Sequence, residues 1–464
     1  MKKILSLSAV CLLGAVALVS CGSGTKSTGS TAASSAAPAS STPTSSTWQE
    51  MAAPTTYNNC NAQIVVWAPA EEEAVIKSVV DTYNAAQTVD TSKFNYTFVA
   101  VSEADGGTTL GSDPTVTNYP SLVAAADDHI NNLVTKNIVN PLQGTMLNRV
   151  KNNDTEFSIS CVTNGSNVYG FPITADNGYF LWYDSSALSG VDMTSLEAIL
   201  AAAKTAGKTV LYDAPNGWYA NSPFMSPDVC GVNSLAWKTG TKTDGTAGIQ
   251  YDTTWDNTDG VAAATSFGTL LKQYYDDGTL VTGGNDVILK GFKEKTMVAA
   301  VSGTWMESIL KPVCDTLAAK ELPNFKIGTK SAHMGSFSGS KLYVVNGFAT
   351  AAEQKAATFL GDLLTNKASQ LVRFQKRASI PCNRALLASS DYTSKATLGA
   401  KALAAQSAYA SIQSRSAEGR YWDVGKAIGQ CFLDGVFGKD ADGNALTTWT
   451  EFLKSKMDAL RLVG

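Results

Sequence analysis

Short apolar runs alternate along the chain with segments whose apolar residues recur at helical spacing. Four such runs predict buried β-strands, at residues 64–67, 96–101, 208–212 and 297–301. After the first run, Glu71 begins a segment with an acidic first turn and an apolar face, which predicts a helix. The chain therefore opens as β-α-β, and the alternation along its length predicts α/β domains with parallel sheets.

The same spacing predicts two further helices. One begins at Asp128 and continues to about Ile138, where Pro141 stops it. The other is long and amphipathic, from Glu353 to Phe374. We find no internal repeat.

The N-terminus has the pattern of a secretory signal peptide, because two lysines precede an apolar run over residues 4–19. Ser20 and Cys21 close it and resemble a bacterial lipobox, in which the cysteine is acylated and becomes the new N-terminus. The run is shorter than the roughly 20 residues of a membrane-spanning helix, although a plain N-terminal anchor is the alternative. We expect an extracytoplasmic protein that is anchored to the cell membrane through lipidated Cys21.

Residues 21–59 are predicted to be a flexible linker, because Ser, Thr, Ala, Gly and Pro dominate them and offer little apolar surface to bury. The linker would let a globular part reach about 30–35 Å, or it is a spacer through a cell wall. The residues that remain are too many for one simple core and predict two domains.

Charged residues make up 16% of the chain and the net charge is −4. With no basic cluster in the mature chain, this composition argues against nucleic-acid binding. No second apolar run has spanning length, which argues against an integral membrane body.

Six of the eight cysteines lie beyond the signal peptide and Cys21. An even number in an exported chain favours disulfides, with buried free thiols as the alternative. Wide spacing, with only two histidines in the chain, argues against zinc, and we predict no metal and no cofactor. The six are Cys60, Cys161, Cys230, Cys314, Cys382 and Cys431.

Several segments, in this order, resemble the extracellular solute-binding proteins of ABC importers, in particular the family 1 or maltose- and sugar-binding group. They are the opening strand with its acidic helix, a first crossing between lobes, a strand leading to a glycine and a tryptophan, and a return crossing followed by a helix. These segments are residues 64–73, 168–184, 297–305, 335–346 and 352–365.

The resemblance implies a two-lobed type II periplasmic-binding-protein fold with a hinge and an interlobe cleft. It implies a monomer that catalyses no reaction, captures a sugar or oligosaccharide by lobe closure and delivers it to the ABC permease. Alternatives are the same fold with a non-sugar solute, an exported carbohydrate-active enzyme, or an adhesin or chemoreceptor module. The expected lobes are residues 60–173 with 343–388, and 174–342 with 389–464.

A sugar site needs aromatic faces for C–H patches and polar groups for hydroxyls. Trp305 matches the family's stacking position, with core packing as its alternative. Trp422 matches a second aromatic position, and Lys426, one helical turn later, a position that is often cationic; its alternative is a solvated lysine.

Three acidic residues match ligand contacts of the family. Asp128 matches a carboxylate that accepts sugar hydroxyls, Asp176 an acidic contact near the hinge, and Glu71 a polar contact near the first strand. Their alternatives are a helix N-cap, a hinge cap and a partner of the helix dipole, respectively. Ala125 stands where maltose-binding members have a stacking tryptophan, which argues against maltodextrin specificity.

The segment that follows the third predicted strand supplies the last ligand contacts that the resemblance implies, Asn216, Trp218 and Tyr219. Surface or core packing is their alternative. Residues 440–444 resemble a calcium loop, but Ala445 stands where that loop needs glycine. A turn into a helix capped by Thr448 and Glu451 accounts for them better.

Overall fold

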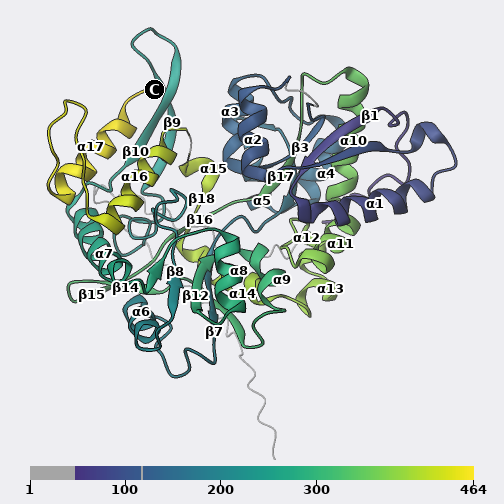
Figure 1. Cartoon of the computed structure of the whole chain (residues 1–464). Coiled ribbons are helices and arrows are strands. Elements are labelled where there is room, and N and C mark those ends of the chain that lie inside the picture. The colour runs from purple at the N-terminus through teal and green to yellow at the C-terminus, as the bar shows by residue number, and fades with distance from the viewer. Residues whose placement is uncertain (1–47, 116–118, 418) are drawn as a thin grey trace, which may run out of the picture. The chain divides into compact units, whose positions relative to one another are not determined.

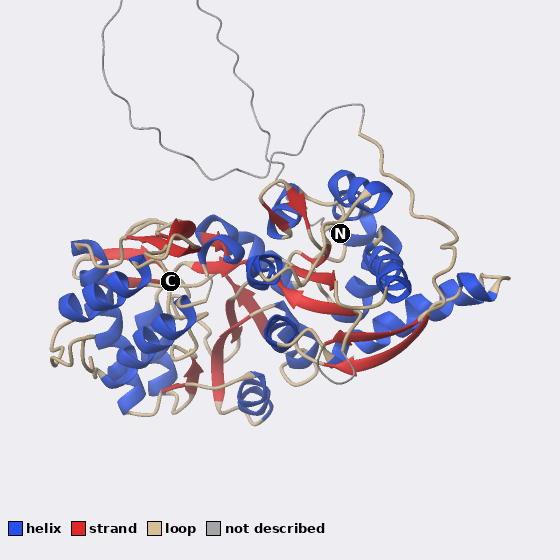
Figure 2. Ribbon diagram, turned by 90° about the horizontal axis from the view of Figure 1, so that it is seen from above, coloured by secondary structure: helices blue, strands red, loops and turns tan. Residues whose placement is uncertain are grey.

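The protein is described by a computed structural model that covers residues 48–115, 119–417 and 419–464. The predicted signal peptide, Cys21 and most of the predicted linker lie outside the described residues. The described chain contains two five-stranded sheets, each covered by helices, which agrees with the predicted two-lobed α/β fold (Figures 1 and 2).

The first sheet has the strand order β2-β1-β3-β17-β6. Strands β1, β2 and β3 are parallel, while β17 runs antiparallel to both of its neighbours. The bounds are β1 (Gln63–Ala68), β2 (Asn95–Ala100), β3 (Leu122–Ala126), β6 (Phe171–Thr174) and β17 (Lys341–Val345).

The second sheet has the order β11-β8-β12-β7-β13. Strand β8 is parallel to β11 and β12, whereas β7 is antiparallel to β12 and β13. The bounds are β7 (Phe180–Asp184), β8 (Thr209–Leu211), β11 (Leu280–Val281), β12 (Met297–Ser302) and β13 (Leu317–Lys320).

The helices divide between the two sheets (Figure 1). On the first are α1 (Glu73–Ala85), α2 (Glu103–Ser112), α3 (Ile130–Thr135), α4 (Gly144–Asn153), α5 (Glu156–Cys161), α10 (Ala351–Thr365), α11 (Lys367–Arg377), α12 (Arg384–Leu387) and α13 (Ser390–Thr393). On the second are α6 (Leu196–Thr205), α7 (Thr258–Asp276), α8 (Asn285–Lys293), α9 (Glu307–Leu310), α14 (Leu398–Gln406), α15 (Gln413–Ser416), α16 (Tyr421–Asp434) and α17 (Trp449–Arg461).

Four two-stranded ladders complete the fold. They are β4 (Thr163–Asn164) with β5 (Asn167–Val168), β9 (Leu235–Thr241) with β10 (Ala247–Thr253), β14 (Asn324–Ile327) with β15 (Lys330–His333), and β16 (Ser336–Ser338) with β18 (Ala410–Ile412).

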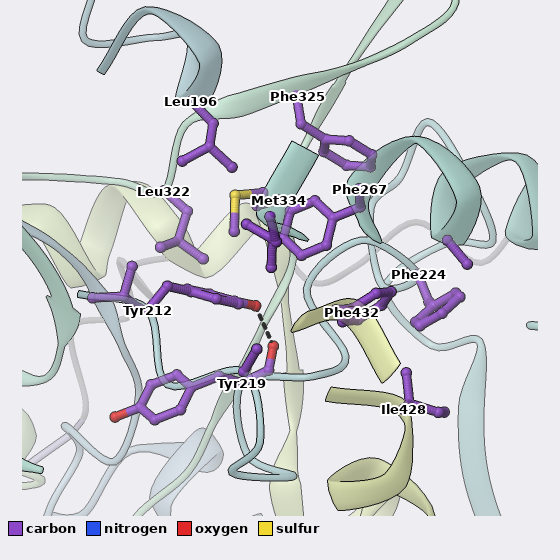
Figure 3. Packing of buried hydrophobic residues seen from close by; sticks show 14 of the residues in the cluster. Leu196, Tyr212, Tyr219, Phe224, Phe267, Leu322, Phe325, Met334, Ile428 and Phe432 are labelled. Carbon is purple, nitrogen blue, oxygen red and sulfur yellow. Dashed lines mark hydrogen bonds between the residues drawn. The ribbon is translucent and has the colours of Figure 1, made fainter. Parts of the chain in front are cut away.

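Separate hydrophobic cores hold the two sheets. Figure 3 shows part of the larger one, where Tyr212, which directly follows β8, packs with aromatic side chains from β14, α7 and α16. In the first lobe, a buried ion cluster joins the turn before α1 to α11: Glu72 receives Arg373 at 3.0 Å and is also paired with Arg377. Although burial opposes it, these guanidiniums lower the pKa of Glu72 to about 2.

Several sequence predictions are confirmed and others need correction. The four predicted strands are present, and β1 and β2 pair in parallel around α1. Both sheets are mixed rather than parallel, because β17 and β7 return in the opposite direction. Tyr179 and Trp182 are fully buried in the second lobe.

Two predicted helices are shorter than the apolar spacing indicated. The segment from Asp128 begins as a 3₁₀ turn, η3 (Asp127–His129), and its helix α3 ends at Thr135. The long helix is broken at Asn366, which adopts an extended conformation and accepts a hydrogen bond from the backbone N–H of Ser369. The capping box of Thr448 and Glu451 is confirmed.

The prediction of disulfides is wrong, because all six of these cysteines are free. They are distributed over separate cores: Cys60 lies with the first sheet, Cys431 with α16, and Cys314 in a third cluster. Burial raises the pKa of each of these thiols. Among the described residues, no helix has the length and apolar character that crossing a membrane requires.

Candidate functional site

The carboxyl ends of the parallel strands in both sheets lead into loops that carry most of the predicted ligand contacts. In open α/β sheets this edge is where ligands bind, because loops and helix N-termini present free polar groups there. From the second sheet come the loops after β8, β11 and β12, and from the first come the turn after β3 and the start of β17.

Trp305 lies in the 3₁₀ turn η4 (Thr304–Met306), which follows β12 directly after Gly303. A Cβ at Gly303 would come within 2.0 Å of the Trp305 ring, so glycine is what allows the indole to lie against the backbone. The indole N–H donates to Oδ1 of Asn285 at 3.1 Å. Trp305 is partly exposed at the end of the strand.

Trp218 stacks on Trp305, with ring centroids 5.7 Å apart and an interplanar angle of 17°. The loop before it is held by Oδ1 of Asn216, which accepts the Trp218 backbone N–H at 3.1 Å. Trp218 Nε1 is buried, and no hydrogen-bond partner for it is found among the described residues. Asn216 is exposed, whereas Tyr219 is buried against Tyr179 and supports the loop from beneath.

Trp422 belongs to the first turn of α16, which lies against the same loop. A Cβ at Gly217 would be 3.1 Å from the Trp422 carbonyl oxygen and 3.3 Å from the Lys426 backbone nitrogen. The Trp422 ring is partly buried and contacts Phe337 edge-on, with centroids 6.4 Å apart. Lys426 is exposed on the following turn. The loops of Trp218 and Trp305 and the start of α16 are therefore neighbours.

Lys341 of β17 and Glu103 of α2 reach this group from the first lobe, and the sequence analysis did not find them. Lys341 is the first residue of β17, and its Nζ lies over the Trp305 ring, 5.4 Å from the centroid. Nζ also pairs with Oε1 of Glu103 at 3.2 Å. The side chains are 12% and 13% exposed. The lysine at the start of the return strand was the available signal, but its partners lie far away in sequence.

Asp128 is buried in η3, and its Oδ1 accepts no hydrogen bond from the described residues. It caps no helix, since Ala126 and His129 hold the N-cap positions of η3 and α3. Its neighbour Asp127, which the sequence analysis missed, accepts the backbone N–H of Ser414 in α15 at 3.3 Å. Burial, together with the nearby Asp128, raises the pKa of Asp127 to about 7.

Two predicted acidic contacts have partners elsewhere. Asp176 is buried, and its Oδ2 accepts the backbone N–H of Ile380 at 3.0 Å. Glu71 is half exposed and pairs with Arg377 at 3.0 Å. As ligand contacts, Asp176 and Glu71 therefore stay predictions from the resemblance.

Two cavities lie away from this group. One, of about 450 Å³, is bounded by residues 50–53 and by α4 and α11; the other, of about 420 Å³, lies beside β15 and includes His333 and Tyr409. Within residues 48–115, 119–417 and 419–464, no cluster of three metal-ligating side chains is found.

The sequence of residues 78–400 matches the family described as bacterial extracellular solute-binding protein. None of the curated proteins matches the chain significantly. Among solved structures, maltodextrin-binding protein MalE1 from L. casei BL23 is 19% identical, with a TM-score of 0.65 over 87% of this chain and 100% of that one.

Two other solved structures have the same fold. The maltose-maltodextrin binding protein of Alicyclobacillus acidocaldarius is 16% identical, with a TM-score of 0.65 over 85% of this chain and 100% of that one. The GacH receptor of Streptomyces glaucescens, solved unliganded and with acarbose, is 15% identical, with a TM-score of 0.65 over 86% and 98%.

Proposed function

Because the chain belongs to the bacterial extracellular solute-binding proteins, we propose that it captures a sugar or oligosaccharide between its lobes and delivers it to the membrane subunits of an ABC importer. One observation carries the sugar assignment: the stacked indoles of Trp218 and Trp305 lie directly beside the Lys341–Glu103 ion pair. The similar structures named for maltodextrin and acarbose support it.

The chemistry of this group suits a neutral polyhydroxylated solute. Indole faces cover the C–H patches of a sugar ring. A carboxylate accepts hydrogen bonds from hydroxyl groups, and an ammonium donates hydrogen bonds to them. Asp128 stays a proposed contact, because its buried Oδ1 accepts no hydrogen bond from the described residues and His129 Nε2 is 3.9 Å away from it. Trp422, Asn216 and Lys426 stay proposed contacts on the rim, and Tyr219 supports the loop.

Transport follows from lobe closure rather than from bond making. A solute that contacts both lobes stabilises the closed arrangement, by no more than its difference in affinity for the closed and open states. The permease then recognises the closed form. We propose that the protein catalyses no reaction on the solute.

Family membership implies an extracytoplasmic location. We propose that Cys21 carries the lipid that holds the protein at the membrane surface, with residues 22–59 as its linker. Replacement of Cys21 by serine should release the protein from the membrane fraction into the medium. Retention of the variant in membranes would contradict a lipid anchor.

The sugar assignment is tested by calorimetric titration of the protein lacking residues 1–21 with glucose, maltose, maltotetraose and acarbose. We expect binding of at least one sugar, and a loss of at least tenfold in affinity for Trp305→Ala. The matched control is Trp48→Ala, since Trp48 is 40% exposed and lies against α4.

Absence of binding across the panel would overturn the sugar assignment. Where a sugar binds, it is recovered from the protein and analysed by mass spectrometry. Unchanged sugar is expected, whereas cleaved or transferred sugar would identify an enzyme.

A further inference from the structure

We propose that Lys341 determines solute specificity: its ammonium contacts Trp305 until a solute arrives and then donates to the solute's hydroxyls, which favours uncharged sugars over cations. This inference rests on the proposed function and adds a residue and a selectivity to it. The observation behind it is that one side chain from the first lobe touches the proposed stacking residue of the second.

The position of Lys341 is fixed by the first sheet. As the first residue of β17 it pairs with Ala126 of β3 on one side and with Thr174 of β6 on the other. Glu103, in the first turn of α2, holds its ammonium at 3.2 Å. The strand pairing fixes the backbone of Lys341 and the carboxylate of Glu103 holds its ammonium, so the side chain is directed to the second lobe.

Trp305 is covered from its own lobe by Trp218 and by the backbone of Gly303. The ammonium of Lys341 contacts the ring from the opposite lobe. A sugar ring that stacks on Trp305 between the lobes meets this ammonium, and the ammonium must move aside. Because Glu103 remains beside it, the displaced ammonium stays at the edge of the solute.

The pair offers both kinds of hydrogen bond that neighbouring sugar hydroxyls need. Nζ of Lys341 is a donor without acceptor capacity, and the ionised Glu103 is an acceptor without donor capacity. At 12% and 13% exposure, these charged partners are largely shielded from water. Hydrogen bonds to charged groups are stronger than those between neutral groups. A cationic solute, by contrast, would place its charge against the ammonium.

The test compares Lys341→Met with wild type in calorimetric titrations with maltotetraose, or with whichever sugar of the panel above binds more tightly. Methionine keeps an unbranched side chain against Trp305 and removes the ammonium. Loss of a charged hydrogen bond predicts affinity about 10- to 100-fold weaker. Lys401→Met is the control, because Lys401 is exposed on α14, and it should bind like wild type.

A second variant, Glu103→Gln, guards against a folding defect in the first. It leaves Lys341 in place without its ionised partner, and it should weaken binding of the same sugar several-fold. Thermal melting of both variants should match wild type. Spermidine, used as the cationic probe, should bind neither wild type nor the control.

The outcomes separate the two proposals. If wild type binds none of the sugars, the proposed function fails and this inference fails with it. If wild type binds a sugar and Lys341→Met binds it equally well or more tightly, the inference alone is overturned. Tight binding of spermidine by wild type would equally overturn the selectivity assigned to Lys341.

Discussion

Asp127 provides a sharp test of the structure, because its carboxyl is fully buried where the first lobe meets α15 of the second. Asn177 Nδ2 lies 3.5 Å from Oδ1, the backbone nitrogen of Ser414 lies 3.3 Å from Oδ2, and the charge of Asp128 acts on the carboxyl. Burial, followed by the field of Asp128, raises the pKa of Asp127 from 3.8 to about 7. We therefore predict that the stability of Asp127→Asn, compared with that of wild type, is more favourable at pH 8 than at pH 5.

The sign follows from proton linkage. Since the folded state has the higher pKa, it holds a proton on Asp127 that the unfolded state releases above about pH 4. The contribution of Asp127 to stability is complete below pH 3.8 and is lost as the pH rises through 7. Each pH unit between the unfolded and the folded pKa lowers the unfolding free energy by about 1.4 kcal/mol. Between pH 5 and pH 8 the contribution of Asp127 to this free energy therefore falls by about 2–3 kcal/mol.

The assay is urea unfolding of wild type and Asp127→Asn, each at pH 5 and at pH 8. Asparagine does not titrate, so the difference in unfolding free energy between the two proteins should move by about 2–3 kcal/mol in favour of the variant at pH 8. Asp90→Asn is the control. Asp90 is exposed and Lys93 lowers its pKa, so its variant should show no such movement in this range. If the difference in unfolding free energy between Asp127→Asn and wild type is the same at both pH values, Asp127 is not a buried carboxyl that stays protonated in the folded state.

Three further predictions concern packing and chemistry. Glu72→Gln should lower the unfolding free energy by about 3–5 kcal/mol in urea titrations, because it leaves Arg373, 1% exposed, without its charge partner; an unchanged midpoint would contradict the ion cluster. Gly303→Ala should weaken sugar binding at least tenfold in calorimetry, because its Cβ would come within 2.0 Å of the Trp305 ring; wild-type affinity would show that the indole does not bind the solute. The urea-unfolded protein lacking residues 1–21 should titrate six thiols without a reductant, since Cys60, Cys161, Cys230, Cys314, Cys382 and Cys431 are free; fewer than six would indicate disulfides.

The sequence predicted β1, β2, β8 and β12 correctly, because buried strands leave a local signal of consecutive apolar residues. It did not predict strand direction, because the antiparallel return of β17 is set by the path of the chain between lobes and not by its residues. It missed the break at Asn366, since apolar spacing continues through the capped junction of α10 and α11.

The candidate site was predicted only in part, because some of its contacts join residues that are far apart in the sequence. Trp218 and Trp305 were found through the resemblance, and the structure brings them into contact. Lys341 and Glu103 were missed because their pairing depends on the register of β17 beside β3 and on where α2 begins. Asp176 and Glu71 stay predictions from the family pattern: Asp176 accepts the backbone N–H of Ile380, and Glu71 pairs with Arg377 of α11.

A crystal structure with the most tightly bound sugar of the panel would show where the solute lies. We predict a sugar ring stacked on Trp305 between the lobes, with hydroxyls within hydrogen-bonding distance of Lys341 and Glu103. A sugar seated in the cavity beside β15 or in the one beside α4 and α11, with the indole of Trp305 untouched, would contradict it.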